Sequence, residues 1–423
     1  MRERSVRKEA GSLKKSRFRG LFALLAVVGP GIITVNAGND AGGIYTYAAV
    51  GATYGYKMLW GLAVITVSMA VIQEMNARMA VVTGKGLADL IREKFGVRVA
   101  FFAMAVLLVA NFCTVLADFA GVAMSLGLFG VSKYVAVPLA AVLIWLLVTR
   151  GSYSRVEKIF LALTFVFFGY IVSAFLAKPD WGVVFGSMAH PSLPMDAGFL
   201  SMFIGMIGTT ITPYMQFYLQ SSIVDKHLSL GDYGFEKVDV YFSAFWGDAV
   251  SFFIIVCTAA TLFKAHIPIE SAAQAALALA PFAGKFASVL FGVGLLGASM
   301  LACAIIPLST SYAICEAFGF ESGVDHDFKE APAFFGIYTA IIALASLLIL
   351  IPGLPLVSLA LVTQEIAGIL SPVILTLMVI LVNDKRIMGK HVNTALQNVV
   401  SGATVGLIVV LSLFLAASPL LRL

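Results

Sequence analysis

Long apolar segments repeat along almost the whole chain and constrain its fold more than any other feature. They lie near residues 21–50, 58–82, 98–126, 134–149, 158–177, 197–224, 238–263, 286–317, 333–352, 355–382 and 396–418. A run of about 20 apolar residues is long enough for a helix to cross the hydrocarbon core of a bilayer. The sequence therefore predicts an all-α polytopic membrane protein with eleven crossings over residues 21–418.

The composition excludes the main alternatives to a membrane protein. Of the 423 residues, 60% are hydrophobic and only 12% are charged, whereas about 25% of the residues of an ordinary soluble domain are charged. This rules out a soluble globular enzyme, a disordered chain and a nucleic-acid-binding domain. The four cysteines show no Cys-x-x-Cys spacing, so the sequence carries no zinc or redox signature.

The basic residues are distributed unevenly between alternate loops. Eight Lys or Arg lie in the first 20 residues, and the positive-inside rule places such a segment in the cytoplasm. With eleven crossings, more basic residues then fall inside (Lys85, Arg92, Lys94, Arg150, Arg155, Lys226, Lys237, Lys329, Lys385, Arg386, Lys390) than outside (Lys57, Lys133, Lys178, Lys264, Lys285, Arg422). We expect a plasma-membrane protein with a basic cytoplasmic segment at 1–20 and an amphipathic surface helix at 85–95. The longest connections, 178–196 and 264–285, are expected outside, as solvated links.

Two of the predicted helices contain sequence that breaks a helix. The first carries small and polar residues from Asn36 to Gly43, and Gly, Asn and Asp all disfavour a helix interior. The sixth carries Thr209, Thr210, Ile211 and Thr212 before Pro213, which removes a backbone donor. Unwound backbone at membrane depth is tolerated only where it faces protein or a water-filled cavity. Both helices are therefore expected to be discontinuous.

Paired breaks at corresponding positions predict an inverted repeat. Repeat one covers about 21–177, repeat two about 197–382, and a further helix covers 396–418. In this architecture a substrate lies between the two breaks, where freed carbonyls such as those of Ala37 and Thr209 act as ligands. The alternative is that each break is a kink that serves packing.

Asp40 lies inside the first break. A carboxylate in mid-membrane costs about 2.5–3.5 kcal/mol on insertion scales, and a bound cation would offset that cost. The alternative is a structural Asp that is protonated or paired with Arg. Because these helices have no deep basic residue, we interpret Asp40 as part of a cation site.

Three segments resemble the Nramp family of divalent-metal transporters. Gly29-Pro30-Gly31 followed by a polar break with Asp40 is similar to the family's first helix. The segment RMAVVTGK at 78–85 resembles the end of its second helix, and NDKRIMGKHVN at 383–393 resembles its loop after helix ten. The resemblance implies a LeuT-like fold and inward movement of divalent metal by alternating access. It also implies no cofactor, because the metal ion is the substrate.

The sequence departs from this family at the positions that bind metal. In the first break, the family's Pro and Asn ligand fall on Ala41 and Gly43. In helix six, the family's Ala, Met, Pro and His fall on Thr209, Thr212, Pro213 and Tyr214, and the stretch beyond Tyr214 needs a one-residue shift. An Asp and a Glu that serve proton movement fall on Val115 and Asp118, and a Gln that reaches the metal falls on Gln364.

These replacements favour a hard cation. Thr212 removes a thioether, a soft ligand, while carboxylate, hydroxyl, carbonyl and water suit Mg²⁺ and Mn²⁺. Gly43 widens the space beside Asp40, and Mg²⁺ commonly keeps several waters. The pattern resembles the Nramp-related magnesium transporters, with Mn²⁺ also carried. Since Tyr214 hardly titrates near neutrality and Val115 does not titrate, we expect transport without proton coupling.

Three acids are secondary candidates for a water-filled vestibule. Glu74 either attracts cations there or is an interfacial acid near Arg78. Asp118 is either a remnant of a proton route or a hydrogen-bonded structural acid. Glu365 follows Gln364, and neighbouring helix positions differ by about 100°, so at most one of the two faces the site.

Other functions remain as alternatives. One alternative is a proton-coupled Mn²⁺/Fe²⁺ importer, but the loss of the thioether ligand speaks against Fe²⁺ as its substrate. Another is a sodium-coupled organic-solute symporter, but the negative charge of Asp40 is unsuited to an anionic substrate. An intramembrane enzyme is disfavoured because the five His lie outside the predicted mid-membrane segments and neither His-Glu-x-x-His nor Gly-x-Ser-x-Gly occurs. The expected partners are a divalent metal ion and the bilayer, with no nucleic acid, and the protein is expected to be a monomer.

Overall fold

The computed structural model describes residues 39–150, 166, 168–194, 196–324 and 328–421, and these residues form helices without any strand. Their α-helices are α4 (Ala41–Tyr54), α5 (Leu59–Thr83), α6 (Leu87–Phe95), α7 (Val97–Gly127), α8 (Lys133–Thr149), α10 (Phe168–Leu176), α11 (Trp181–Ala189), α12 (Ala197–Thr210), α13 (Pro213–Asp225), α14 (Tyr233–Thr258), α15 (Ala272–Ala276), α16 (Ala280–Ala283), α17 (Ala287–Phe318), α18 (Pro332–Ile349), α19 (Leu356–Asn383), α20 (Lys385–Met388) and α21 (Ala395–Leu421).

Eight helical stretches of this described part are long and apolar enough to cross a membrane. They are Leu59–Thr83, Val97–Gly127, Ala197–Asp225, Tyr233–Phe263, Ala272–Phe318, Pro332–Ile349, Leu356–Asn383 and Ala395–Leu415. Helix α8 is apolar but shorter, with 17 residues. The predicted crossings at 21–50 and 158–177 lie partly outside the described residues. The structure therefore supports a polytopic helical protein, while the number eleven stays a prediction.

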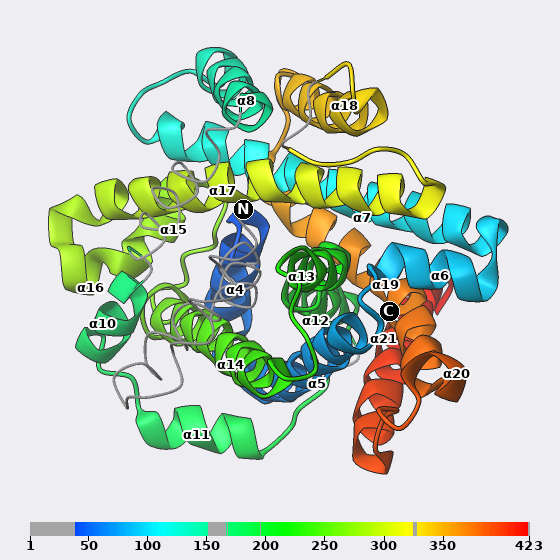
Figure 1. The fold of residues 1–423 in the computed structure, drawn as a ribbon. Helices are drawn as coiled ribbons and strands as arrows, with labels where there is room; N and C mark the ends of the chain where they lie inside the picture. Colours follow the sequence, from blue (N-terminus) through cyan, green and yellow to red (C-terminus); the bar gives the residue numbers. More distant parts are fainter. Residues whose placement is uncertain (1–38, 151–165, 167, 195, 325–327, 422–423) are drawn as a thin grey trace, which may run out of the picture.

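The elements of the two predicted breaks lie at the centre of the molecule (Figure 1). Helices α4, α12 and α13 are surrounded there by α5, α14, α17, α7 and α19, with α8 and α18 further out. Helix α12 ends at Thr210 and α13 begins at Pro213, in agreement with the helix-breaking effect of proline and its preference for the first helical turn. Helix α4 begins directly after Asp40, so Ala41, Gly42 and Gly43, which were expected to belong to the other break, are helical.

The helices outside the centre differ from expectation in one place. The amphipathic segment is helix α6, which buries Leu87, Ala88, Leu90 and Ile91 and is joined to α20 by the ion pair of Lys94 with Asp384. The links 178–196 and 264–285, however, contain α11, α15 and α16. Residues Ala275 to Leu279 are largely buried, and Ser173 of α10 donates a hydrogen bond to the carbonyl of Ala278 (2.8 Å). The expectation of solvated connections is therefore wrong for the second link.

Glycines bring the backbones of α12 and α19 into direct contact. A Cβ atom at Gly208 would lie 2.1 Å from the Gln364 carbonyl oxygen and 2.5 Å from the Gly368 nitrogen. A Cβ atom at Gly368 would lie 2.5 Å from the Ile204 carbonyl oxygen. Only hydrogen fits at both positions, and this close approach holds the Gln364 segment of α19 against the end of α12.

Substitution of Gly208 by Ala tests this contact. The added methyl group meets rigid backbone, so the two helices must separate, and we expect a loss of stability of about 1–3 kcal/mol from overpacking. The control is Gly406→Ala on α21, where a Cβ atom meets nothing within 4 Å and Ala is the better helix former by about 1 kcal/mol. Thermal unfolding of purified protein measures both variants, and equal unfolding temperatures would contradict the close contact.

Candidate metal site between the two helix breaks

Asp40 is the N-cap of α4 and is fully buried. Its Oδ1 accepts a hydrogen bond from the Gly43 amide (2.6 Å), which satisfies one of the free N–H groups of the first helical turn. Its Oδ2 is buried and has no hydrogen-bond partner. The carboxylate therefore lies at the positive end of α4 with one oxygen free to bind a ligand.

A second carboxylate reaches the same helix end. Asp118 of α7 accepts a hydrogen bond from the Ala41 amide through Oδ1 (3.1 Å), and its Oδ2 is likewise buried without a hydrogen-bond partner. Asp118 is fully buried. Two acids that share the first turn of one helix repel each other when both are ionised, so they require a cation or a proton between them. Asp118 was a secondary candidate, either a remnant of a proton route or a hydrogen-bonded structural acid; its hydrogen bond with Ala41 brings it to the same helix end as Asp40.

The second break supplies hydroxyl groups. The Oγ1 atoms of Thr209 and Thr212 are buried and make no hydrogen bond within the described structure. The neighbouring Thr210 lies with its Oγ1 2.7 Å from the hydroxyl of Tyr47 on α4. This hydrogen bond joins the end of α12, where the second break begins, to the middle of α4.

Gln364 of α19 completes the group of buried polar side chains. A Cβ atom at Gly42 would lie only 1.8 Å from Gln364 Nε2, which places the amide directly beside the first turn of α4. Neither amide atom of Gln364 has a hydrogen-bond partner. Unpartnered buried polar groups are costly. Asp40, Asp118 and Gln364 carry them at the first turn of α4, and Thr209 and Thr212 carry them at the second break.

The remaining expected site residues contribute less. Gly43 donates its amide to Asp40 and has no side chain to offer. Tyr214 lies fully buried in the first turn of α13, and its carbonyl accepts a hydrogen bond from Ser309 of α17 (3.4 Å). Ala37 lies outside the described residues.

Glu74 is not available to a cation. Its carboxylate is bonded to Arg78 (Oε1–Nε 3.1 Å and Oε2–Nη2 3.3 Å), to Gln397 Nε2 (2.6 Å) and to the Tyr233 hydroxyl. Arg78 also donates to the carbonyl of His391 (2.7 Å) and to Asn393 Oδ1 (2.6 Å). Of the two alternatives for Glu74, the structure favours the acid near Arg78, because the guanidinium compensates its charge and both oxygens are occupied.

Glu365 points away from the site. It accepts a hydrogen bond from Ser201 of α12, which precedes Thr209 by eight residues and so lies about 12 Å along the helix from it. The neighbouring Gln364 turns toward α4 instead. Gln364 thus lies toward α4 and Glu365 toward α12, so we keep Gln364 in the candidate site and leave Glu365 out of it.

Two polar residues of α13 were missed from the sequence. Gln216 and Gln220 follow Thr212 at spacings of four, are fully buried, and carry unpartnered oxygens, as Thr212 does. The Gln216 carbonyl accepts a hydrogen bond from Asn76 of α5. The polar residue at every fourth position of this helix could have indicated a shared polar face. The one-residue shift needed to align the stretch beyond Tyr214 with the family prevented that inference.

The donor set fits a hard cation. The described residues hold no group of three or more His, Cys, Asp and Glu, so the site combines two carboxylates with hydroxyl and amide groups. Oxygen ligands of this kind suit Mg²⁺, Ca²⁺ and Mn²⁺.

Comparison with known proteins shows the family of this chain. The family model "Natural resistance-associated macrophage protein-like" (Nramp) matches residues 31–418. "Divalent metal cation transporter MntH" of Erwinia tasmaniensis is 33% identical over 307 residues, 70% of this chain and 72% of that protein. The protein of the same name from Yersinia pestis is 26% identical over 406 residues, which cover 94% of this chain and 96% of that protein.

Solved structures confirm the fold class. The Eremococcus coleocola manganese transporter superposes with a TM-score of 0.79 at 20% identity, covering 96% of this chain and 88% of that one. Mhp1, a nucleobase-cation-symport-1 family transporter, superposes with a TM-score of 0.54 at 16% identity, covering 92% and 90%. The architecture is the LeuT-like fold that the sequence predicted. With a family model matched over nearly its whole length, the chain belongs to the Nramp family.

Proposed function

We propose that this chain is a divalent metal cation transporter that imports Mg²⁺, with Mn²⁺ as a second substrate, across the plasma membrane by alternating access. The observation that carries the proposal is the free, fully buried Oδ2 of Asp40 at the start of α4, beside a second buried acid, Asp118. A divalent cation would compensate both charges. The relatives named above are transporters rather than enzymes, and the metal ion is substrate, with no resident cofactor.

The side chains around Asp40 support Mg²⁺ over softer metals. Thr209, Thr212 and Gln364 offer hydroxyl and amide oxygens, while the thioether nearest in sequence, Met215, contacts Gln73 of α5 (Nε2–Sδ 3.8 Å). Gly43 adds no side chain beside Asp40, which leaves room for a cation that keeps part of its water shell.

The route inward continues along α13. Thr212, Gln216 and Gln220 share one face, because their spacing of four brings them to the same side of the helix. Their oxygens lack hydrogen-bond partners in the described structure, so they suit a hydrated cation that passes when this face opens. In the orientation favoured by the basic loops, this face leads from the site to the cytoplasm.

Transport is proposed to be driven by the membrane potential alone. Tyr214 stands where the family pattern has a His, and Val115 where it has an Asp, so two of the groups that would carry protons are absent. Moving two charges inward is favoured by roughly 4.6 kcal/mol per 100 mV. The alternative is a proton-coupled Mn²⁺ importer, which is favoured by one observation: Asp118 remains an acid and has a free buried oxygen.

Replacement of Asp40 by Asn tests the metal site. Asn keeps the N-cap of α4 but removes the charge, so uptake of Mg²⁺ into liposomes should fall at least about tenfold, as expected for loss of one charged ligand, while the protein stays folded. Asp196→Asn is the matched control, because Asp196 caps α12 through the Phe199 amide (2.9 Å) in the same way without lying at the site. Retained uptake in Asp40→Asn would exclude Asp40 as the main ligand.

A second substitution tests the selectivity. Thr212→Met combined with Gly43→Asn introduces a thioether and an amide, so competition by Cd²⁺ against Mn²⁺ uptake should strengthen. Ile211→Met is the control. Ile211 lines a cavity between α5, α12 and α21, so a thioether introduced at this position would lie away from the site. Unchanged Cd²⁺ competition in the double variant would show that discrimination arises elsewhere.

A further inference from the structure

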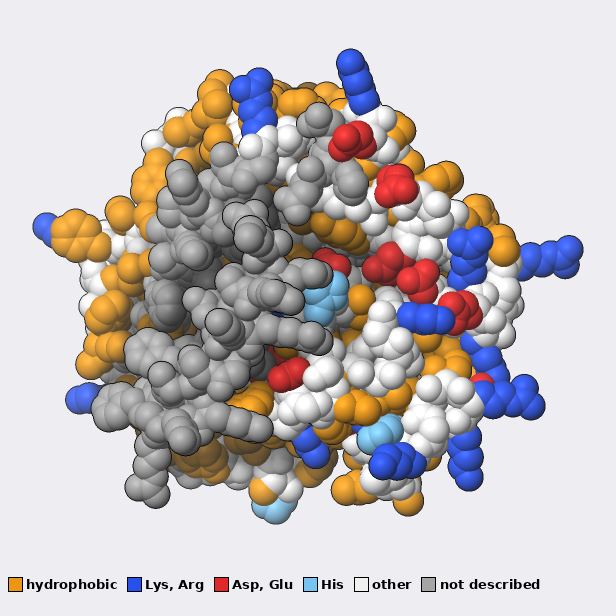
Figure 2. All heavy atoms as spheres, in the orientation of Figure 1, with side chains coloured by type: hydrophobic (Ala, Val, Ile, Leu, Met, Phe, Trp, Pro, Cys, Tyr) orange, Lys and Arg blue, Asp and Glu red, His pale blue; other side chains and the backbone are white. Residues whose placement is uncertain are grey.

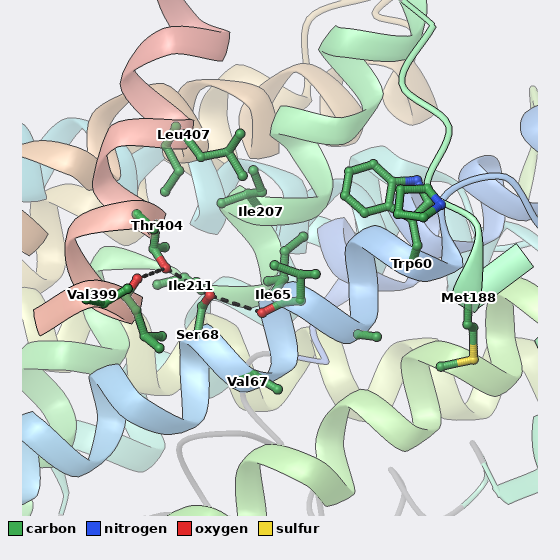
Figure 3. A pocket seen from close by; sticks show the side chains of 16 residues that line it. Trp60, Ile65, Val67, Ser68, Met188, Ile207, Ile211, Val399, Thr404 and Leu407 are labelled. Atoms are coloured by element: carbon green, nitrogen blue, oxygen red, sulfur yellow. Dashed lines mark hydrogen bonds between the residues drawn. The ribbon is translucent and has the colours of Figure 1, made fainter. Parts of the chain in front are cut away.

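Two cavities adjoin each other along α5. The first, of about 490 Å³, lies between α5, α12 and α21 and includes Trp60, Ile207 and Leu407 (Figure 3). The second, of about 420 Å³, lies between α5, α11 and α14. Ala63, Val67 and Met188 line both. Both cavities are mostly apolar, so their difference lies in the few polar groups that each contains.

The polar groups of the first cavity are already bonded to each other. The hydroxyls of Ser68 and Thr404 lie 2.8 Å apart, as Figure 3 shows. Ser68 also donates a hydrogen bond to the carbonyl of Val64 (3.0 Å). A ligand of this cavity would gain no polar partner. It is the kind of groove that hydrocarbon from the bilayer fills.

The second cavity contains a carboxylate with a free oxygen. Asp248 of α14 lines it and is only 6% exposed, and its Oδ2 is buried with no hydrogen-bond partner. Thr66 lines the same cavity and donates its own hydroxyl proton to the carbonyl of Leu62 (2.8 Å). Among the described residues that line the cavity there is no lysine or arginine, so none of them pairs with an ionised Asp248.

The rest of the lining is aromatic and aliphatic. Phe185 of α11 and Phe245 and Phe252 of α14 line the cavity together with Met188 and Leu59. A hydrated divalent ion needs several oxygen ligands, which this lining lacks. An organic cation needs one counter-charge and apolar or aromatic surfaces, and the faces of aromatic rings also attract cations. The volume lies within the range typical of small-molecule sites.

We propose that the cavity between α5, α11 and α14 binds a lipophilic ammonium, an amine with an aryl or alkyl body that reaches it from the bilayer. The ammonium group pairs with Oδ2 of Asp248, and the body packs against Phe185, Phe245 and Phe252. This site is separate from Asp40, and its occupancy does not depend on which metal the protein carries.

Binding of two matched probes to the full-length protein in nanodiscs tests the proposal. Radiolabelled 4-phenylbutylamine carries the charge, and 4-phenylbutanol has the same body without it; binding to empty nanodiscs is subtracted for both. Because a charge-assisted hydrogen bond to the buried carboxylate is available only to the amine, the amine should bind the wild type about tenfold more tightly than the alcohol. Equal binding of amine and alcohol to the wild type would overturn the proposal without reference to any variant.

Variants then locate the site. Asp248→Asn keeps the shape and removes the charge, so amine binding should weaken about tenfold while alcohol binding stays the same. Ser68→Ala, in the first cavity, should leave amine binding unchanged. Amine binding that is unaffected by Asp248→Asn would show that the amine binds elsewhere, and loss of amine binding in Ser68→Ala would assign it to the first cavity.

Discussion

The first turn of α4 depends on the attraction between free backbone amides and two buried carboxylates. Asp40 accepts from Gly43 and Asp118 accepts from Ala41, so one helix end binds both acids through half of their oxygens. The other half remain unpartnered at membrane depth. Such an arrangement is stable only if positive charge arrives, since like charges in a low-dielectric interior repel strongly. Under the proposed function, the transported metal ion supplies this charge.

The surrounding helices keep that position in place. Contact between Gly208 and the backbone of α19 holds Gln364 beside α4, and the hydrogen bond between Tyr47 and Thr210 joins α4 to the end of α12. A different group of polar residues, around Glu74 and Arg78, shows what a satisfied network looks like: its charges are paired and its oxygens are occupied. The residues around Glu74 and Arg78 hold helices together, whereas the residues around Asp40 keep unpartnered oxygens that are proposed to bind the metal ion.

Local sequence patterns were sufficient for the main features of the fold. The length of the apolar runs predicted the helices, because a crossing of fixed thickness needs a fixed number of residues, and Pro213 located the start of α13. The same patterns could not reveal α15 and α16, since short helices in a link have no long apolar run. The family resemblance identified Asp40, Thr209, Thr212 and Gln364 as candidates; in the structure all four are buried with unpartnered polar atoms, and Gln364 lies beside the first turn of α4.

Long-range contacts account for the errors. Of the partners of Glu74, only Arg78 is close in the sequence; Tyr233 and Gln397 lie 159 and 323 residues away, so the sequence did not show that both carboxylate oxygens are occupied. Asp118 was expected to have a minor role, because the amide that it meets belongs to Ala41, 77 residues earlier. Residue type predicts what a side chain can bind, but only the packing of distant helices decides what it meets.

The most direct measurement follows metal uptake and lumenal pH together in liposomes that contain the purified protein. Mg²⁺, Mn²⁺ and Cd²⁺ are offered singly and in competition, under an inside-negative potential and with a pH-sensitive dye inside. An all-oxygen site around Asp40 without proton coupling should carry Mg²⁺ and Mn²⁺ at constant lumenal pH, with Cd²⁺ competing no better than Mn²⁺. Preferred uptake of Cd²⁺, or acidification of the lumen that depends on metal, would contradict this account.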